Sequence, residues 1–309
     1  MKSGFGPLLV GLGSFLWATD ALVRVPAIAK SDPSFIVFVE HLVGVIALLP
    51  VFWFGSRRNL FRLGSWKNWL ACAFVGAGGS ALALLFFTQA FQFLNPNLNI
   101  LLQKTQPIAV VLIAFLFLKE KPGENFYTWA GVSIFSCMVL NFFDAETPGV
   151  DHNSNLAKGI AYSLSASLIW ALSTVTGKKL LDQVDPLVAT FWRFVFGLIT
   201  LIFLLAFGSG FSAMHTLFEP EYRLTYLYLG IFPGVLAMWT YYRGMKATTA
   251  ITTTIVELIF PVGSIVLNYF FLGSTLTPLQ MVFSVVLLLS VTQISMIDAK
   301  RAAGPEQPA

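Results

Sequence analysis

Long apolar runs alternate along the chain with short breaks rich in polar residues, proline or glycine. A bilayer core of about 30 Å needs roughly 20 apolar residues per helix. Ten runs approach or reach this length, and the fifth is the shortest. They cover residues 5–23, 34–54, 68–91, 97–118, 126–143, 158–178, 187–207, 222–243, 250–272 and 278–297. Several runs are apolar on every face, unlike the alternating strands of an outer-membrane barrel. We therefore predict an all-α polytopic membrane protein with ten transmembrane helices.

The two halves of the chain repeat one another at a nearly constant offset in sequence. The matching pairs are Trp17 with Trp170, Asp32-Pro33 with Asp185-Pro186, Gly44 with Gly197, Gly76 with Gly230 and Pro107 with Pro261. Matches in register across four predicted spans indicate a duplication. Each copy holds five spans, an odd number, so the second copy enters the membrane inverted. We predict a first repeat over 5–143, an extracytoplasmic linker over 144–157, a second repeat over 158–297 and a tail over 298–309.

Charged residues are few, and the basic ones are distributed unevenly between the two predicted sides of the membrane. Of the 309 residues, 56% are hydrophobic and 11% are charged, against about 25% charged in soluble domains. A soluble domain is thereby excluded, and two cysteines exclude a disulfide scaffold. With the N-terminus inside, thirteen Lys and Arg fall in inner segments and four in outer ones. This positive-inside bias predicts that both termini are cytoplasmic. We expect the membrane to be a bacterial inner membrane. The net charge of +4 is accounted for by these loops, and no nucleic-acid partner is predicted.

Four ionisable residues lie deep inside predicted spans: Glu40, Lys104, Arg193 and Glu257. Each costs about 2.5–3.5 kcal/mol near the bilayer centre, which makes each a candidate for function. The helical rise along each span puts Glu40 and Lys104 in an outer layer and Arg193 and Glu257 in an inner layer. We predict two pairs, Glu40 with Lys104 and Arg193 with Glu257. They would act in gating or coupling, or simply lock helices together; both interpretations stay open.

Other polar and aromatic side chains are candidates for substrate binding. Asp20 and Arg24 lie four residues apart and can pair on one helix face, while Arg24 is close enough to the outer end to snorkel. Asp20 would bind a substrate amine or a proton, or only Arg24. Trp17 and Trp170 hold equivalent positions and would form aromatic walls, or serve as ordinary packing. The predicted substrate-binding set is Trp17, Asp20, Gln89, Lys104, Trp170, Trp239, Tyr242 and Glu257.

Four segments carry a resemblance to a known family: SFLWATDAL, LLQKTQPIAVVLIAFLFLKEK, LIWALSTVTGKKL and VELIFPVGSIVLNYFFLGSTLTPLQ. Together they resemble the drug/metabolite transporter superfamily, specifically its ten-span branch with two EamA-type repeats, over about residues 6–297. The resemblance implies export or exchange of small metabolites, amino acids or drugs by alternating access. It also implies a central pocket framed by spans one, three, four, six, eight and nine. The acidic residue usual after span four is present as Glu120, but its counterpart after span nine is Ser274.

Two other classes of function compete with a carrier. A channel or passive facilitator would need a polar helix stripe or a filter, which the predicted spans lack, and the inverted repeat favours alternating access instead. An intramembrane enzyme would need paired aspartates or a His-Glu-x-x-His metal motif, which His41, His152 and His215 do not form. We therefore predict no enzyme, no metal and no cofactor. The predicted partners are a small-molecule substrate and the lipid bilayer, with a proton as a candidate coupling ion alongside exchange and facilitated diffusion.

Overall fold

The computed structural model describes residues 5–54, 63–109, 112–113, 124–142, 156–208, 210–248, 253 and 256–303. Every regular element in those ranges is a helix. The first half contains α1 (Gly6–Ala18), α2 (Asp20–Ile28), α3 (Pro33–Phe54), α4 (Trp66–Phe74), η1 (Val75–Leu82), α5 (Ala83–Ala90), α6 (Pro96–Gln103) and α8 (Phe126–Phe142). The second half contains α9 (Leu156–Leu181), α10 (Pro186–Phe207), η2 (Gly210–Leu217), α11 (Pro220–Leu229), η3 (Gly230–Leu236), α12 (Ala237–Ala247), α14 (Ile259–Leu272) and α15 (Pro278–Ala303).

Seven helical segments of the described chain are long and apolar enough to cross a membrane. They are Gly6–Ile28, Pro33–Val51, Trp66–Ala90, Leu156–Leu181, Pro186–Phe207, Tyr222–Ala247 and Pro278–Ile297. Two shorter apolar helices are Phe126–Leu140 and Ile259–Leu272. The first segment continues to Ile28, past the end that the sequence predicted at residue 23. Parts of the predicted spans 97–118 and 250–272 lie outside the described residues, although α6 and α14 begin or end within those spans.

Two helices begin with the same local device. The Asp32 side chain accepts a hydrogen bond from the backbone N–H of Ser34 at 2.8 Å, one residue after Pro33 starts α3. Asp185 accepts from the N–H of Leu187 at 2.9 Å, where Pro186 starts α10. An acidic N-cap followed by proline satisfies an otherwise free donor and presets the first helical φ. The repeated Asp-Pro dipeptide thus sets the start of the second long helix in each half.

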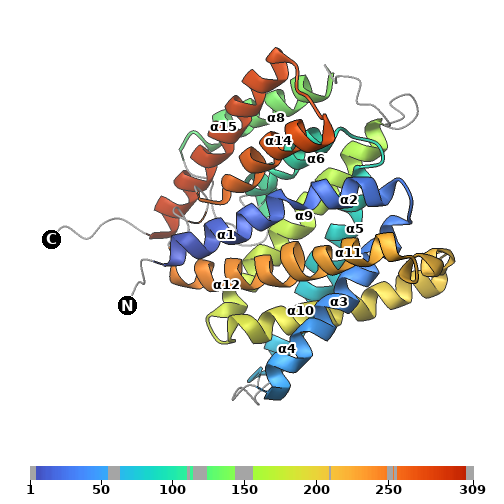
Figure 1. Ribbon diagram of the computed structural model, residues 1–309. Coiled ribbons are helices and arrows are strands. Elements are labelled where there is room, and N and C mark those ends of the chain that lie inside the picture. The colour runs from blue at the N-terminus through green and yellow to red at the C-terminus, as the bar shows by residue number, and fades with distance from the viewer. Residues whose placement is uncertain are drawn as a thin grey trace.

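The helices pack side by side in one bundle (Figure 1). α8 lies against α15 at one end of the bundle, and α3 and α10 lie against each other toward the opposite end. Between them, α1 packs on α12 and α14, and α9 packs on α5 and α6. α3 also contacts η3, and α10 contacts η1. In each of these contacts, elements at equivalent positions of the repeat take equivalent partners from the other half of the chain.

Close helix packing follows the same correspondence. A Cβ added at Gly76 in η1 would lie 2.7 Å from the carbonyl oxygen of Arg193. One added at Gly230 in η3 would lie 2.9 Å from the carbonyl oxygen of Glu40. Only glycine permits such a backbone approach. The matched glycines found in the sequence are therefore the points where the third helical segment of one half meets the second of the other.

Candidate functional site

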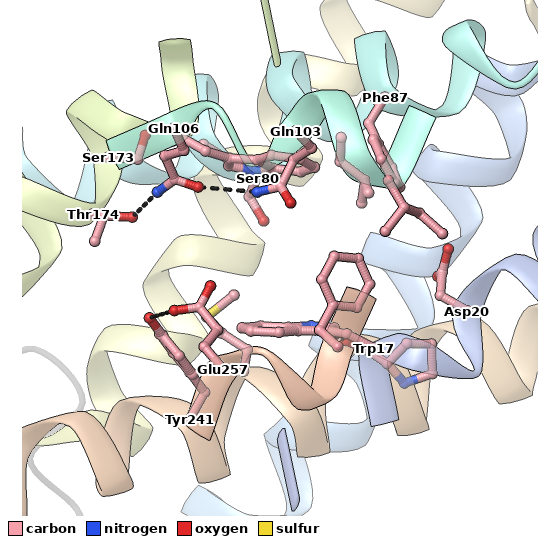
Figure 2. Close-up of a pocket in the computed structure, with 18 of the residues that line it drawn as sticks. Trp17, Asp20, Ser80, Phe87, Gln103, Gln106, Ser173, Thr174, Tyr241 and Glu257 are labelled. Carbon is pink, nitrogen blue, oxygen red and sulfur yellow. Dashed lines mark hydrogen bonds between the residues drawn. The ribbon is translucent and has the colours of Figure 1, made fainter. Parts of the chain in front are cut away.

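A cavity lies where the two halves meet, with a volume of about 160 Å³ (Figure 2). Its walls come from α1, α2, α3, η1, α5, α6, α9, α10, η3, α12 and the start of α14, together with residues next to these helices. Among the predicted residues, the lining includes Trp17, Asp20, Glu40, Lys104, Trp170, Arg193, Tyr242 and Glu257. Gln89 and Trp239 do not line it; Trp239 instead packs against the hydrophobic cluster around α10 and α12, with the Arg243 guanidinium 5.7 Å from its ring.

Asp20, Arg24 and Glu40 form one buried cluster on the first-half side. Arg24 donates from Nε to Asp20 Oδ2 at 2.6 Å and from one terminal nitrogen to Asp20 Oδ1 and Glu40 Oε2, both at 2.7 Å. Its other terminal nitrogen donates to Thr88 Oγ1 at 3.2 Å. Arg24 is 0% exposed, so the predicted snorkelling to the outer interface is wrong. The guanidinium turns inward because two carboxylates offset its desolvation better than a single surface contact would.

The break between α1 and α2 positions this cluster. Thr19 interrupts the helix, and its hydroxyl donates to the Leu16 carbonyl at 2.7 Å. Asp20 then occupies the first turn of α2, where the helix dipole favours a carboxylate. Arg24 follows one turn later and reaches back to it. A break in a membrane helix is tolerated where the backbone lines a polar cavity.

Lys104 and Glu257 form the second charged group. Lys104 Nζ lies 3.3 Å from Glu257 Oε1 and 4.7 Å from the centre of the Phe260 ring. The Tyr241 hydroxyl donates to Glu257 Oε2 at 3.1 Å. Lys104 directly follows the last residue of α6, and Glu257 lies two residues before α14. Both charges therefore sit at helix ends, beside backbone groups that can line a polar space.

Arg193 has no carboxylate within ion-pair distance among the described residues. It donates to the Tyr242 hydroxyl at 3.0 Å and to the Gly79 carbonyl at 2.9 Å, and its Nε has no partner there. The two predicted pairs, Glu40 with Lys104 and Arg193 with Glu257, are wrong. The depth of each charged residue along its helix placed the predicted partners in one layer. Depth alone does not determine which helices face each other. Glu40 faces α2, and Glu257 faces the end of α6.

The two tryptophans occupy mirrored places. Trp17 Nε1 donates to the Pro233 carbonyl at 3.0 Å, and its ring packs 4.9 Å from Tyr241. Trp170 Nε1 donates to the Gly79 carbonyl at 2.8 Å, and its ring packs 5.3 Å from Phe87. Both acceptors lie in π-helical turns, η1 and η3, a geometry frequent at functional sites.

Several cavity residues were missing from the predicted set. Gln103 Nε2 donates to Gln106 Oε1, and Gln106 Nε2 donates to Thr174 Oγ1, each at 3.0 Å. This row faces Trp17 and Glu257 across the cavity (Figure 2). One signal was available in the sequence: Gln103 is the repeat-equivalent of Glu257. Neutral polar residues carry too small an insertion cost to stand out beside charged ones.

His41 holds a further cavity residue in place. His41 Nδ1 lies 2.8 Å from the Val37 carbonyl, and Nε2 lies 2.9 Å from the Ser80 hydroxyl. A carbonyl only accepts, so Nδ1 is the donor. In the neutral ring Nε2 then accepts, and the Ser80 hydroxyl donates to it. Ser80 lines the cavity, so its oxygen is left to accept from a ligand.

The cavity as a whole is balanced in charge. Its charged lining residues are Asp20, Glu40 and Glu257 on the acidic side and Arg24, Lys104 and Arg193 on the basic side. Their distribution is uneven, because the Arg24 cluster has one excess carboxylate and Arg193 is an unpaired cation in the described structure. No group of three His, Cys, Asp or Glu in the described residues is placed to hold a metal. The site can therefore bind a polar molecule of zero net charge without leaving a net charge buried.

Several apolar helices, and a cavity lined by charged and aromatic residues of both halves, define the chain as a multi-pass membrane protein of the transport class. The chain belongs to the EamA-like transporter family. The sequence profile of that family matches residues 4–142 and again residues 157–296. The resemblance to the drug/metabolite transporter superfamily is thereby confirmed.

Individual relatives are transport proteins too. The chain is 29% identical to "Riboflavin transporter ImpX" of Fusobacterium nucleatum over 95% of this chain and 98% of that protein. It is 26% identical to an uncharacterized transporter of Clostridium kluyveri, over 98% of this chain and 96% of the relative. A solved crystal structure with 20% identity matches it with a TM-score of 0.61, covering 97% of this chain and 99% of that one. That last likeness shows the fold.

Proposed function

We propose that the chain is a secondary transporter that moves a small organic solute by alternating access, as an exporter or exchanger. In this proposal ten spans form two inverted five-helix repeats, with both termini in the cytoplasm of a bacterial inner membrane. The cavity is the substrate site. Inverted repeats suit alternating access because two mirror-related halves can exchange conformations around a fixed central site.

The observation that carries this proposal is the construction of the cavity from equivalent parts of both halves. Trp17 with Pro233 and Trp170 with Gly79 make the same kind of contact at equivalent positions of the repeat. Each bond joins one half to the other. If the halves exchanged conformations, either bond could part on one side while its mirror image persisted on the other.

The aromatic lining favours a substrate with a planar ring. Trp17, Trp170, Tyr241, Phe87 and Phe260 all face the cavity. Such side chains offer flat apolar surface for stacking. The relative from Fusobacterium is named a riboflavin transporter, and riboflavin combines a planar ring system with zero net charge. We therefore take a flavin-like heterocycle as the first substrate class to test.

The decisive experiment uses the full-length protein in proteoliposomes preloaded with unlabelled riboflavin. Labelled riboflavin added outside should accumulate transiently by counterflow and saturate with concentration, as a carrier requires. W17A should reduce this flux by tenfold or more, whereas W66A should not, because Trp66 is 68% exposed outside the cavity. Unsaturable flux without counterflow would identify a channel. Counterflow of an amino acid in place of riboflavin would keep the carrier and change the substrate.

Proton coupling belongs to the same proposal and has its own test. The two carboxylates of Asp20 and Glu40 share the single cation Arg24, which also donates to the Thr88 hydroxyl. A proton bound there during part of the cycle would neutralise the excess charge. An imposed pH gradient should then drive accumulation in the wild type, and E40Q should retain counterflow but lose that drive. Equal accumulation with and without the gradient would contradict coupling.

A further inference from the structure

The side-chain amide of Gln103, in the cavity wall, has hydrogen-bonding capacity that no described residue uses. The residue is 6% exposed and lines the cavity at the end of α6. Its Nε2 donates to Gln106 Oε1 at 3.0 Å, and Gln106 in turn donates to Thr174. Oε1 of Gln103 has no hydrogen-bond partner in the described structure. The amide is therefore held in a fixed orientation on one side and left open on the other.

The open side of this amide has a defined chemistry. A glutamine amide carries two N–H donors and one carbonyl acceptor. The bond to Gln106 uses one donor, so one N–H and the carbonyl oxygen are left. A buried polar atom without a partner is costly, and a group that supplies its bonds is correspondingly favoured. The complementary group is a ring N–H beside a ring carbonyl, as found in lactams and imides.

We propose that Gln103 binds the lactam or imide edge of a planar heterocyclic substrate, with Gln106 and Thr174 holding the Gln103 amide in position. This inference rests on the transport function proposed above, and it identifies the part of the substrate that the site recognises by hydrogen bonds. The edge is uncharged, which fits a cavity lined by three acids and three bases. The ring attached to it would lie among aromatic side chains such as Phe260 and Trp170, which share the lining.

A matched pair of probes tests this assignment. Riboflavin carries an imide N–H between two carbonyls, and 3-methylriboflavin carries a methyl group on that nitrogen. Binding of each to the purified full-length protein is measured by quenching of flavin fluorescence. The wild type should bind riboflavin about tenfold more tightly than the methylated compound, the effect of one buried hydrogen-bonding edge.

Three variants separate hydrogen-bond recognition of the substrate edge from the shape of the side chain. Q103L keeps the side-chain size and removes the polar edge. It should bind both flavins with equal affinity, at the level at which the wild type binds 3-methylriboflavin. Q92L, which changes an exposed glutamine, should keep the tenfold preference. Q106L should lower the preference without abolishing it, because it frees the Gln103 amide to rotate.

The outcomes distinguish this inference from the transport proposal. A preference that persists in Q103L would be steric and would overturn the role of Gln103. Failure of the wild type to bind riboflavin, lumichrome and uracil, which share the imide edge, would also overturn it. Saturable counterflow of another solute would in that case leave the carrier function standing. Loss of counterflow for every solute, with flavin binding intact, would instead overturn transport alone.

Discussion

The indole nitrogen of Trp17 lies 3.0 Å from the carbonyl oxygen of Pro233, in a π-helical turn of the opposite half. Trp170 makes the same bond to Gly79, which stands at the position equivalent to Pro233. The two acceptors differ in one respect. Gly79 also accepts from Arg193 at 2.9 Å, whereas Trp17 is the one side-chain donor to Pro233 in the described structure. The equivalent of Arg193 is Glu40, which cannot donate as a carboxylate.

This difference predicts unequal effects of two matched substitutions. W17F should lower the free energy of unfolding by about 1 kcal/mol, because it removes the side-chain donor to Pro233. W170F should cost less, since Arg193 still donates to Gly79. Circular dichroism at 222 nm on heating gives both values, with W66F as a control for the exposed tryptophan. A larger loss for W170F than for W17F would contradict this interpretation.

Close helix packing at Gly76 and Gly230 can be tested with alanine. In G76A the new Cβ would lie 2.6 Å from Phe196 Cβ and 2.7 Å from a carbonyl oxygen. In G230A it would lie 2.6 Å from a methyl group of Val43. Each variant should lose about 1–3 kcal/mol of stability, the usual cost of overpacking. G131A is the matched control, because nothing lies within 4 Å of its added Cβ and alanine favours helix.

We expect the stability of the protein to depend strongly on Arg24, the single cation of its cluster with Asp20 and Glu40. R24Q would leave the carboxylates of Asp20 and Glu40 buried without a counter-charge. It should cost about 3 kcal/mol or more of stability, measured by thermal unfolding. R24K should recover only part of this, since an ammonium cannot reproduce the fork of two bonds to Asp20.

A triple variant separates stability from transport in this cluster. R24Q/D20N/E40Q carries no unpaired charge and should unfold close to the wild-type temperature. If the charges couple transport to protons, the triple variant should keep counterflow but lose the accumulation driven by a pH gradient. Accumulation driven by the gradient at the wild-type level would show that the cluster only joins helices.

Direct pairing of Lys104 with Glu257 can be tested by exchanging the two charges. K104Q and E257Q should each destabilise the protein by about 2–3 kcal/mol, because the pair is largely buried and each change leaves one charge alone. The swapped variant K104E/E257K restores opposite charges at the 3.3 Å contact and should regain at least half of that loss. K178Q, at an exposed lysine, should be neutral. A swap as unstable as the sum of the single changes would argue against direct pairing.

The proposed orientation predicts which cysteine labels react from outside. Cys72 and Cys137 are buried and can be replaced by alanine. S154C, in the predicted linker, should react with a membrane-impermeant maleimide on intact cells. S3C should react only after permeabilisation. The reverse pattern would invert the proposed topology.

Much of the site was predictable from residue type and register. Charged residues in apolar runs are costly, so Glu40, Lys104, Arg193 and Glu257 stood out, and all four line the cavity. Trp17 and Trp170 were found because the repeat placed them at equivalent positions. Asp20 and Arg24 pair as their spacing of four allows. Partner choice between helices was not predictable, and both pairs inferred from depth were wrong.

The sequence by itself determined the class of protein, because the length of the apolar runs predicts membrane helices and the matches in register between the two halves indicate a duplication. These are local or periodic properties that follow from covalent order. The tertiary structure decided that Arg24 turns inward to two acids, that Arg193 meets Tyr242 and Gly79, and that Gln103 keeps an open edge. Those contacts depend on the rotation of each helix about its axis, which packing of the whole bundle sets and no single segment encodes.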